Sequence, residues 1–480
     1  MHANEPGRIF INGINGVTGD YLVSPQTPAE IAGIAKGLSA DTFTSEWLSR
    51  MAQVLTRAHF EISFDKDPTS IKDVGWAVVF HANEDAVVRK QLLSLVEHRR
   101  KQAGKDDIVK ELEYREGEGL VTWLARHDVS SGSVVPNKVP YYILLVGGPE
   151  KIPFSFGFLL DVEYQVGRIA FDTPEEYAQY VQSVIDYETD TGTTALNSKE
   201  IVYFGSRHAF DEATQLSADM LITPLADHAL NEEIMPLAEK MGFAKRKLIG
   251  REATKEALTG IFSGKVGRTP ALMMSATHGM GWPVDDSHQK SSSGALVCQD
   301  WPGLGGIGPG HYFAGSDLPN DAKVHGMISF CFACYGAGVP DRDRFFHNRN
   351  QQPPQIASKP FFSDLPRKLL THGNGGSLAF IGHVERAWDC SFGGRSSQIM
   401  PFYNALGRIM MGQPVAYAMK TFNEKYAILS ADLSRKLEDV GFGAEISDDE
   451  LANNWLQRND AEGYIVFGDP AVRLRINDLQ

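Results

Sequence analysis

Apolar runs separated by amphipathic stretches dominate the chain from about residue 74 onwards. The runs 75–80, 141–148, 201–205, 270–276, 325–333 and 376–382 have strand length and do not alternate with polar residues. Strands that are buried on both faces have this pattern, because helices cover both sides of a parallel sheet. A final apolar pair, 464–468 and 472–476, closes the chain with two further strand candidates.

Helical patterns lie between these runs. Val88, Leu92, Leu95 and Val96 repeat at the spacing of one helix face. The segment 173–176 (TPEE) has the pattern of a capping box with proline at the first helical position, and it predicts the start of a helix. The chain therefore alternates between strands and helices, which is typical of the α/β class.

We expect a mostly parallel sheet sandwiched by helices, organised as two related α/β subdomains. The first subdomain is predicted over 73–195 and the second, which carries the candidate chemistry, over 196–480. Residues 1–72 form a region of unclear role, with a helix-like stretch around 30–55 and no recognised chemistry. Ligands of such sheets bind beyond the carboxyl ends of strands, so reactive residues at strand ends are the ones to find.

Charge and cysteine content restrict the function classes. The chain has 46 basic and 60 acidic residues and a net charge of -14, which argues against a general binder of nucleic acid or of anionic membranes. The first residues have no basic stretch followed by an apolar run, so we expect no secretory signal. Four cysteines in 480 residues do not form a disulfide scaffold, and we expect a cytoplasmic location.

Two predicted strands end at residues that can act together. The run 270–276 leads into His278 and Gly279, and the run 325–333 leads into Cys334. A thiol nucleophile needs a base within hydrogen-bond reach and backbone N–H donors for an oxyanion. Neighbouring strand ends can place His278 beside Cys334. Gly279 has no Cβ, so its N–H can approach a substrate carbonyl, and the N–H of Cys334 is the natural second donor.

Other interpretations of these residues remain open. Cys331 and Cys334 form a Cys-x-x-Cys pair, but a redox pair of this kind opens a helix, and this one lies in or just after a strand-like run. A zinc site would need two more soft ligands, and Cys298 and Cys390 lack the usual paired spacing. His383 also follows an apolar run, and we interpret it as a structural or pocket-wall residue.

The pair of an apolar strand before His-Gly and an apolar strand before Ala-Cys, in this order, resembles the caspase–gingipain–legumain–separase group of cysteine peptidases. The resemblance is closest to the bacterial gingipain-like and CHAT-domain branches. Four further segments are similar to segments of those proteins: 144–154 (LLVGGPEKIPF), 161–168 (DVEYQVGR), 332–338 (FACYGAG) and 464–474 (YIVFGDPAVRL). The resemblance covers roughly residues 75–475.

The resemblance implies a caspase-like α/β sandwich and a Cys–His dyad that requires no metal or organic cofactor. Cys334 would attack the scissile carbonyl, His278 would protonate the leaving amine, and the N–H groups of Gly279 and Cys334 would bind the oxyanion. The related enzymes that cut after Arg or Lys have an acidic residue at the base of the pocket. A basic P1 residue is therefore expected, with three candidates for the pocket acid: Asp161, Glu163 and Asp389.

The segment 338–360 is rich in Pro, Arg, Asn and Gln and is predicted to be an exposed loop. Three arginines in it, at Arg342, Arg344 and Arg349, make it a hypothetical self-cleavage segment. The expected partners are a protein or peptide substrate and an activating protein, and the resemblance suggests a latent enzyme of a bacterial defence or regulatory pathway. The alternative is a catalytically silent scaffold or signalling module of the same fold.

Overall fold

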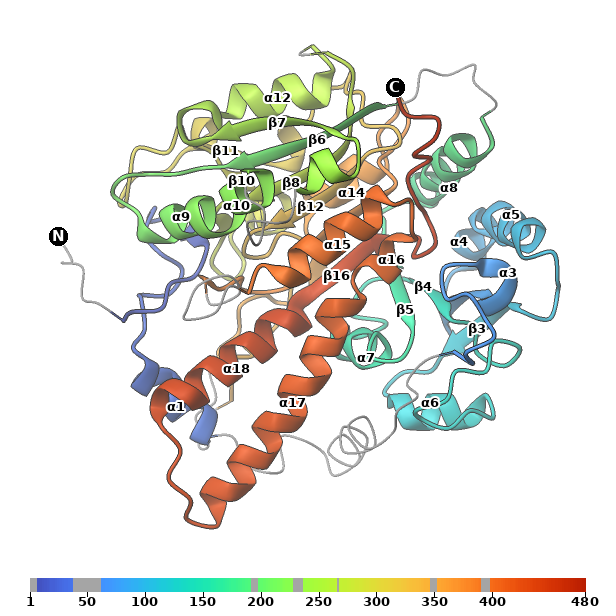
Figure 1. Cartoon of the computed structure of the whole chain (residues 1–480), viewed down its shortest axis with the longest axis horizontal. Coiled ribbons are helices and arrows are strands. Elements are labelled where there is room, and N and C mark those ends of the chain that lie inside the picture. Colours follow the sequence, from blue (N-terminus) through green and yellow to red (C-terminus); the bar gives the residue numbers. More distant parts are fainter. Residues whose placement is uncertain are drawn as a thin grey trace.

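The computed structural model describes residues 7–37, 62–190, 197–227, 236–265, 267–345, 352–389 and 398–480. One large sheet forms the centre of this part of the chain (Figure 1). In the order in which they lie side by side, its strands are β3 (Val109–Tyr114), β2 (Trp76–His81), β4 (Tyr142–Val146), β5 (Gln165–Ile169), β16 (Tyr464–Gly468), β15 (Ala379–His383), β12 (Ile328–Phe332), β8 (Pro270–Ala276), β6 (Ser198–Gly205) and β7 (Ala244–Ile249).

The sheet consists of two parallel halves that run in opposite directions. Strands β3, β2, β4, β5 and β16 are parallel to one another, as are β15, β12, β8, β6 and β7. The halves meet where β15 pairs antiparallel with β16. The predicted mostly parallel sheet is confirmed. Of the final apolar pair, 464–468 forms β16, whereas 472–476 is not a strand.

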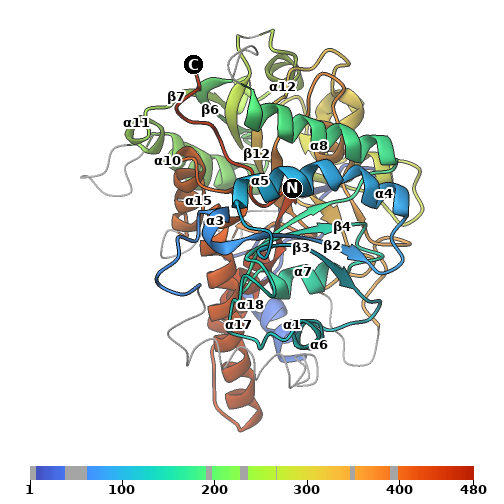
Figure 2. The same cartoon turned by 90° about the vertical axis from the view of Figure 1, so that its right-hand side faces the viewer.

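Both faces of the first half are covered by helices (Figure 2). Trp76, Val78 and Phe80 of β2 belong to one buried cluster, and Ala77 and Val79 between them belong to another. The first cluster includes side chains of α4 (Ala86–Gln91), α5 (Leu93–Ala103) and α8 (Pro174–Thr189), and the second includes side chains of α6 (Leu120–Arg126) and α7 (Phe154–Leu160). The non-alternating apolar runs therefore reflect burial on both faces.

The helix over 174–189 begins as its sequence predicts. The Thr173 hydroxyl accepts a hydrogen bond from the Glu176 N–H at 3.3 Å, and the Glu176 carboxylate accepts one from the Thr173 N–H at 3.2 Å. The reciprocal pair satisfies two N–H groups that the helix itself leaves unbonded. Tyr177 and Tyr180 then point into the core.

The other α-helices and one π-helix lie around both halves of the sheet and in the lower part of the molecule in Figure 1. They are α3 (Ile71–Val74), α9 (Glu212–Leu216), the π-helix η2 (Ser217–Ile222), α10 (Thr223–Asp227), α11 (Leu237–Lys240), α12 (Lys255–Ser263), α13 (Gln289–Ser292), α14 (Asp364–Leu370), α15 (Met400–Met410), α16 (Val415–Ala418), α17 (Lys420–Gly441) and α18 (Asp448–Gly463). Helices α17 and α18 form an antiparallel hairpin, and α1 (Pro28–Gly37) packs against α18. Lys36 of α1 pairs with Asp448 of α18 at 2.6 Å.

A small second sheet lies where β8 ends. Its strands, in order, are β1 (Gly13–Asn15), β9 (Gly279–Gly281), β10 (Leu296–Val297) and β11 (Tyr312–Phe313). Strand β1 pairs parallel with β9, which starts directly after His278. Residues from the region 1–72 are thereby bonded to the segment that carries the candidate histidine.

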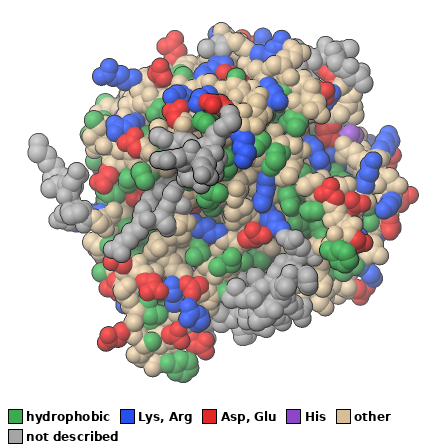
Figure 3. Space-filling model, viewed as in Figure 1, with side chains coloured by type: hydrophobic (Ala, Val, Ile, Leu, Met, Phe, Trp, Pro, Cys, Tyr) green, Lys and Arg blue, Asp and Glu red, His purple; other side chains and the backbone are tan. Residues whose placement is uncertain are grey.

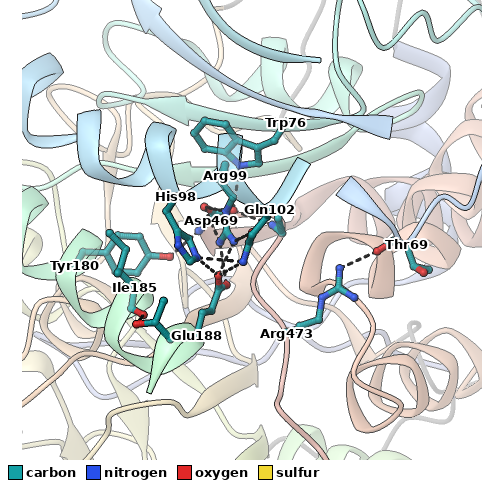
Figure 4. A network of polar contacts seen from close by, with 12 residues as sticks. Thr69, Trp76, His98, Arg99, Gln102, Tyr180, Ile185, Glu188, Asp469 and Arg473 are labelled. Carbon is teal, nitrogen blue, oxygen red and sulfur yellow. Dashed lines mark hydrogen bonds and ion pairs between the residues drawn. The ribbon is translucent and has the colours of Figure 1, made fainter. Parts of the chain in front are cut away.

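A buried ion-pair network links helices of the first half to the end of β16 (Figure 4). Arg99 of α5 donates to both carboxylate oxygens of Glu188 in α8, at 2.6 and 3.0 Å. It also donates to Asp469 at 3.1 Å, and Asp469 accepts a hydrogen bond from the Trp76 indole at 3.2 Å. The predicted segments 73–195 and 196–480 thus share both a sheet and a polar core. Their division into two subdomains stays a prediction.

Candidate active site

The structure brings His278 and Cys334 to neighbouring strand ends. In the register of β8 and β12, Ala276 lies opposite Phe332. His278 and Cys334 each follow two residues later, so both come directly beyond the same edge of the sheet, as the sequence predicts. Both side chains are fully buried, with 0% of their surface exposed.

Asp211 binds His278 and was not foreseen from the sequence. The His278 Nε2 lies 2.8 Å from the Asp211 Oδ2. Asp211 is the N-cap of α9, and its carboxylate also accepts hydrogen bonds from the Thr214 N–H at 2.9 Å and from the Tyr21 hydroxyl. A carboxylate with three donors around it is held in one position, and it fixes the histidine ring in turn.

The charge state of this pair follows from its surroundings. Burial raises the pKa of Asp211, but the charge and hydrogen bond of His278, with the bonds from Thr214 and Tyr21, outweigh it and hold the pKa well below its usual value. Asp211 is therefore ionised at neutral pH and accepts the Nε2–H of His278. This leaves Nδ1 as the nitrogen that can exchange a proton, and Nδ1 has no hydrogen-bond partner among the described residues.

The Cys334 thiol is protonated in this state. Its Sγ accepts a hydrogen bond from the Ala387 N–H at 3.3 Å. Burial nevertheless raises the pKa of the thiol to about 12, far above neutral pH. Since the thiolate is the reactive form, Cys334 needs a base that takes its proton before it can react.

The two predicted oxyanion donors converge on one oxygen. The N–H groups of Gly279 and Cys334 both donate to the carbonyl oxygen of Asn12, at 2.8 and 3.1 Å. A Cβ on Gly279 would collide with the Cys334 carbonyl, so this close approach requires glycine. The geometry is that of a hole for an oxygen, occupied here by the chain's own carbonyl group.

The segment around Asn12 lies in the site and is held there by backbone hydrogen bonds. Asn12 donates its N–H to the Ala387 carbonyl at 3.0 Å, and Phe10 accepts a hydrogen bond from the Asp389 N–H at 3.3 Å. The Phe10 N–H donates to the Asp389 carboxylate at 3.1 Å. The sequence of residues 1–72 has no recognised chemistry. The structure instead places part of that region over the candidate nucleophile.

The three candidate acids for a P1 pocket have different surroundings. The Asp161 carboxylate is partly buried, accepts a hydrogen bond from the Val166 N–H at 3.0 Å, and has a pKa raised well above its usual value by desolvation. Glu163 is also buried. Hydrogen bonds place Asp389 against Phe10, two residues before Asn12. None of these contacts tests the assignment of a pocket acid, which stays a prediction.

The predicted self-cleavage loop is described in part. The Arg342 guanidinium donates to the Pro353 carbonyl at 3.1 Å, and Arg344 pairs with Glu462 of α18 at 2.9 Å. Arg349 lies outside the described residues. Two short strands, β13 (Gly338–Val339) and β14 (Phe361–Phe362), pair at the two ends of the loop. Cleavage in this loop stays a prediction.

Cys298, Cys331 and His383 have structural surroundings. Cys298 and Cys331 are buried and unbridged, and burial raises the pKa of Cys331 to about 12. Cys390 is not among the described residues. His383 lies with its Nε2 3.1 Å from the Asp460 carbonyl. Within the ranges given above, no group of three or more His, Cys, Asp or Glu side chains is arranged to hold a metal ion.

No described helix is suited to span a membrane. None of the helices in the described ranges combines the length and the apolar character needed to cross a bilayer. On the face shown in Figure 3, acidic and basic side chains are interspersed.

Comparisons with known proteins give distant likenesses in structure alone. No protein-family model and no curated protein sequence matches the chain. A structure described as a protease has 13% identity and a TM-score of 0.44 over 83% of this chain and 78% of its own. The complex of the Porphyromonas gingivalis RgpB pro- and mature domains has 12% identity and a TM-score of 0.39 over 84% and 80%.

The Saccharomyces cerevisiae separase–securin complex has 9% identity and a TM-score of 0.28, over 68% of this chain and 15% of that one. At such low identity and structural overlap, these likenesses assign neither a family nor an activity to the chain.

Proposed function

We propose that the protein is a cysteine endopeptidase in which Cys334 is the nucleophile and His278 its acid–base partner. The observation that carries the proposal is the carbonyl oxygen held between the N–H groups of Gly279 and Cys334, at 2.8 and 3.1 Å. Two convergent backbone donors beside a thiol are what acyl transfer requires, because negative charge develops on that oxygen. The hydrogen bond between His278 and Asp211 adds a fixed proton carrier.

In the proposed reaction, the Cys334 sulfur attacks the carbonyl carbon of the scissile bond while the two N–H groups hold the oxyanion. His278 takes the thiol proton on Nδ1 and passes it to the leaving amine, and Asp211 stabilises the imidazolium at Nε2. Water then enters, His278 accepts one of its protons, and the thioester is hydrolysed to a carboxylate and the free thiol. No metal or organic cofactor takes part in these steps.

The proposed enzyme is latent in the described state. Cys334 and His278 are both fully buried, and a strand of the same chain lies over them. A substrate reaches the thiol only after that strand has left, so an activating event, such as binding of a partner protein, belongs to the proposal. A place in a bacterial defence or regulatory pathway and a cytoplasmic location stay predictions from the resemblance.

The basic P1 residue expected from the sequence is a separate hypothesis. It needs a carboxylate at the pocket floor that is available to a guanidinium or ammonium group. The Asp161 carboxylate already accepts the Val166 N–H, so it contributes no direct support for a basic pocket. A panel of fluorogenic peptides with Arg, Lys, Asp or Asn at P1 decides between these preferences.

The same panel tests the proposed function. Once the covering segment has left the site, we expect hydrolysis of at least one peptide by the wild type and by Cys331→Ala, and no hydrolysis by Cys334→Ala. Cys331 is the matched control, since it is buried three residues away in β12 and its pKa is raised by burial in the same way. Hydrolysis by Cys334→Ala at the rate of an active wild type would overturn the assignment of the nucleophile.

A further inference from the structure

Residues 10–13 occupy the site in the register of a bound substrate. We infer that they are the enzyme's own substrate, with Asn12 at P1 and Gly13 at P1′, and that Cys334 cuts the bond between them. The inference rests on the proposed peptidase function. It goes beyond that function because it names the bond, the residue preferred at P1 and the event that uncovers the site.

The backbone contacts before the bond are those of a substrate strand. The Asn12 N–H donates to the Ala387 carbonyl at 3.0 Å, and the Phe10 carbonyl accepts the Asp389 N–H at 3.3 Å. Ile11 lies between them in an antiparallel bridge with Trp388. Main-chain pairing of this kind binds extended peptides and leaves alternate side chains to be read by pockets. The Asn12 carbonyl oxygen, between the Gly279 and Cys334 N–H groups, completes the register.

The contacts after the bond hold the other side of the peptide. Gly13 starts β1, which pairs parallel with β9 from Gly279 onwards. A Cβ on Gly13 would come within 2.9 Å of the Cys334 Sγ and would also collide with Leu22. A side chain at the position next to the bond would therefore displace Leu22 or Cys334, and the sulfur lies beside the segment that it is proposed to attack.

The Asn12 side chain points to the chemistry of the P1 pocket. It is fully buried, and neither its Oδ1 nor its Nδ2 has a hydrogen-bond partner in the described part of the chain. Burial of a polar group without a partner is costly, so the pocket is expected to complete these bonds when the cleavage geometry forms. The side chain buried at this position is a neutral amide. A longer cationic side chain would need a carboxylate that the Asn12 contacts do not include.

A second Asn-Gly pair in the same segment serves as an internal control. Asn15 and Gly16 follow three residues later. The Asn15 Oδ1 accepts hydrogen bonds from the N–H groups of Val17 at 2.9 Å and Thr18 at 3.2 Å, so this side chain closes a turn. The same dipeptide thus closes a turn at one place and contains the proposed scissile bond at the other.

The proposed cleavage balances as an ordinary hydrolysis. The Cys334 sulfur forms a bond to the Asn12 carbonyl carbon, and the bond from that carbon to the Gly13 nitrogen breaks. The thiol proton reaches the Gly13 amine through His278. One water then hydrolyses the thioester, so that Asn12 ends in a carboxylate and the thiol is restored. The residues up to Asn12 are then held only by non-covalent contacts and can leave the site.

The test is the intact mass and the N-terminal sequence of the purified chain after incubation. We expect the wild type to yield a fragment that begins at Gly13 and Cys334→Ala to stay uncut. Two matched variants add the same charge at the two Asn-Gly pairs. Asn12→Asp is expected to reduce the cleavage rate at least tenfold. Asn15→Asp keeps an acceptor oxygen for the turn and is expected to be cut as the wild type is.

A second pair of variants tests occupation of the site. Gly13→Ala inserts the colliding Cβ, whereas Gly33→Ala adds a Cβ in α1 where no atom lies within 4 Å. We expect Gly13→Ala to expel the segment, and iodoacetamide to alkylate Cys334 at least tenfold faster in it than in uncut Gly33→Ala. Equal rates would show that the segment does not cover the thiol, and would overturn the inference.

The outcomes separate this inference from the proposed function. Hydrolysis of the peptide panel by a wild type that stays uncut, or that is cut at Asn15 or within 338–360, overturns the inference and leaves the peptidase intact. Peptide hydrolysis by Gly13→Ala alone, with no cut in the wild type, means that the segment inhibits but is not cleaved. The absence of peptide hydrolysis in every variant, including Gly13→Ala, overturns both.

Discussion

At the scale of single residues, the site depends on a carboxylate that has no local sequence signal. Asp211 precedes a short helix and has the pattern of an ordinary N-cap. Its contact with His278 spans 67 residues, and its contact with Tyr21 spans 190. His278, Gly279 and Cys334 could be found from sequence, because each residue type follows a buried strand. Asp211 and Asn12 could not, because only the folded chain brings them to those strand ends.

Replacement of Asp211 by Asn tests its role as a positioning residue. The amide keeps the size of the side chain but removes the charge that stabilises the imidazolium, so we expect kcat on a fluorogenic peptide to fall by about 10²- to 10⁴-fold with KM nearly unchanged. The pH profile of kcat should also change, since the imidazolium formed during the reaction loses its anionic partner. Asp219→Asn is the control, because Asp219 pairs with Arg207 at the surface.

A merely structural role for Asp211 would give a different result. A fall in the free energy of unfolding, with kcat and its pH profile unchanged in the folded fraction, would contradict the positioning role.

At the scale of elements, the apolar runs predict the strands well, because a strand that is buried on both faces is an uninterrupted run of apolar residues. The run at 472–476 resembles a strand but contains Arg473 and Arg475, whose guanidinium groups donate to backbone carbonyls of Thr69 and Tyr187. These long-range hydrogen bonds replace strand pairing. Strand β1 was not foreseen either, since its three residues, GIN, carry too little pattern to distinguish a strand from a loop.

The network of Arg99, Glu188 and Asp469 fixes helices α5 and α8 to the end of β16 (Figure 4). Arg99→Met removes the cation and leaves two buried carboxylates, so we expect the free energy of unfolding at pH 7 to fall by about 3–5 kcal/mol. Urea unfolding measures this change. Arg100→Ala is the control, because Arg100 is an exposed neighbour paired with Glu97, and its loss should cost about 1 kcal/mol or less.

The same network predicts a dependence on pH. Burial raises the pKa of Glu188, but Arg99 and His98 outweigh it and lower the pKa from its model-compound value of 4.5 to about 2. The stabilisation from this lowered pKa is present above 4.5 and is lost as the pH falls towards 2. In Arg99→Met the acid-side loss should be smaller. A loss as steep as that of the wild type would contradict the assignment to Glu188.

At the scale of the whole molecule, the sheet explains how a short strand can control the site. The strand ends that carry His278 and Cys334 lie under β1 and the residues before it, and α1 anchors this segment on α18. Burial by the segment and protonation of the thiol belong to the same closed state. The sequence predicts the layers and the strand-end chemistry. It does not predict which distant segment covers them, because backbone hydrogen bonds hold that segment.

The most direct test of the central claim is the position of covalent labelling by a thiol-reactive peptide probe. Gly13→Ala, whose site is expected to be open, is incubated with probes that end in Asn or Arg, and peptide mapping locates the modified residue. We predict labelling at Cys334, and at least a tenfold slower rate when His278→Ala is added. Labelling of Cys298, Cys331 or Cys390 with Cys334 unmodified, or a rate at Cys334 that is indifferent to His278, would contradict the account.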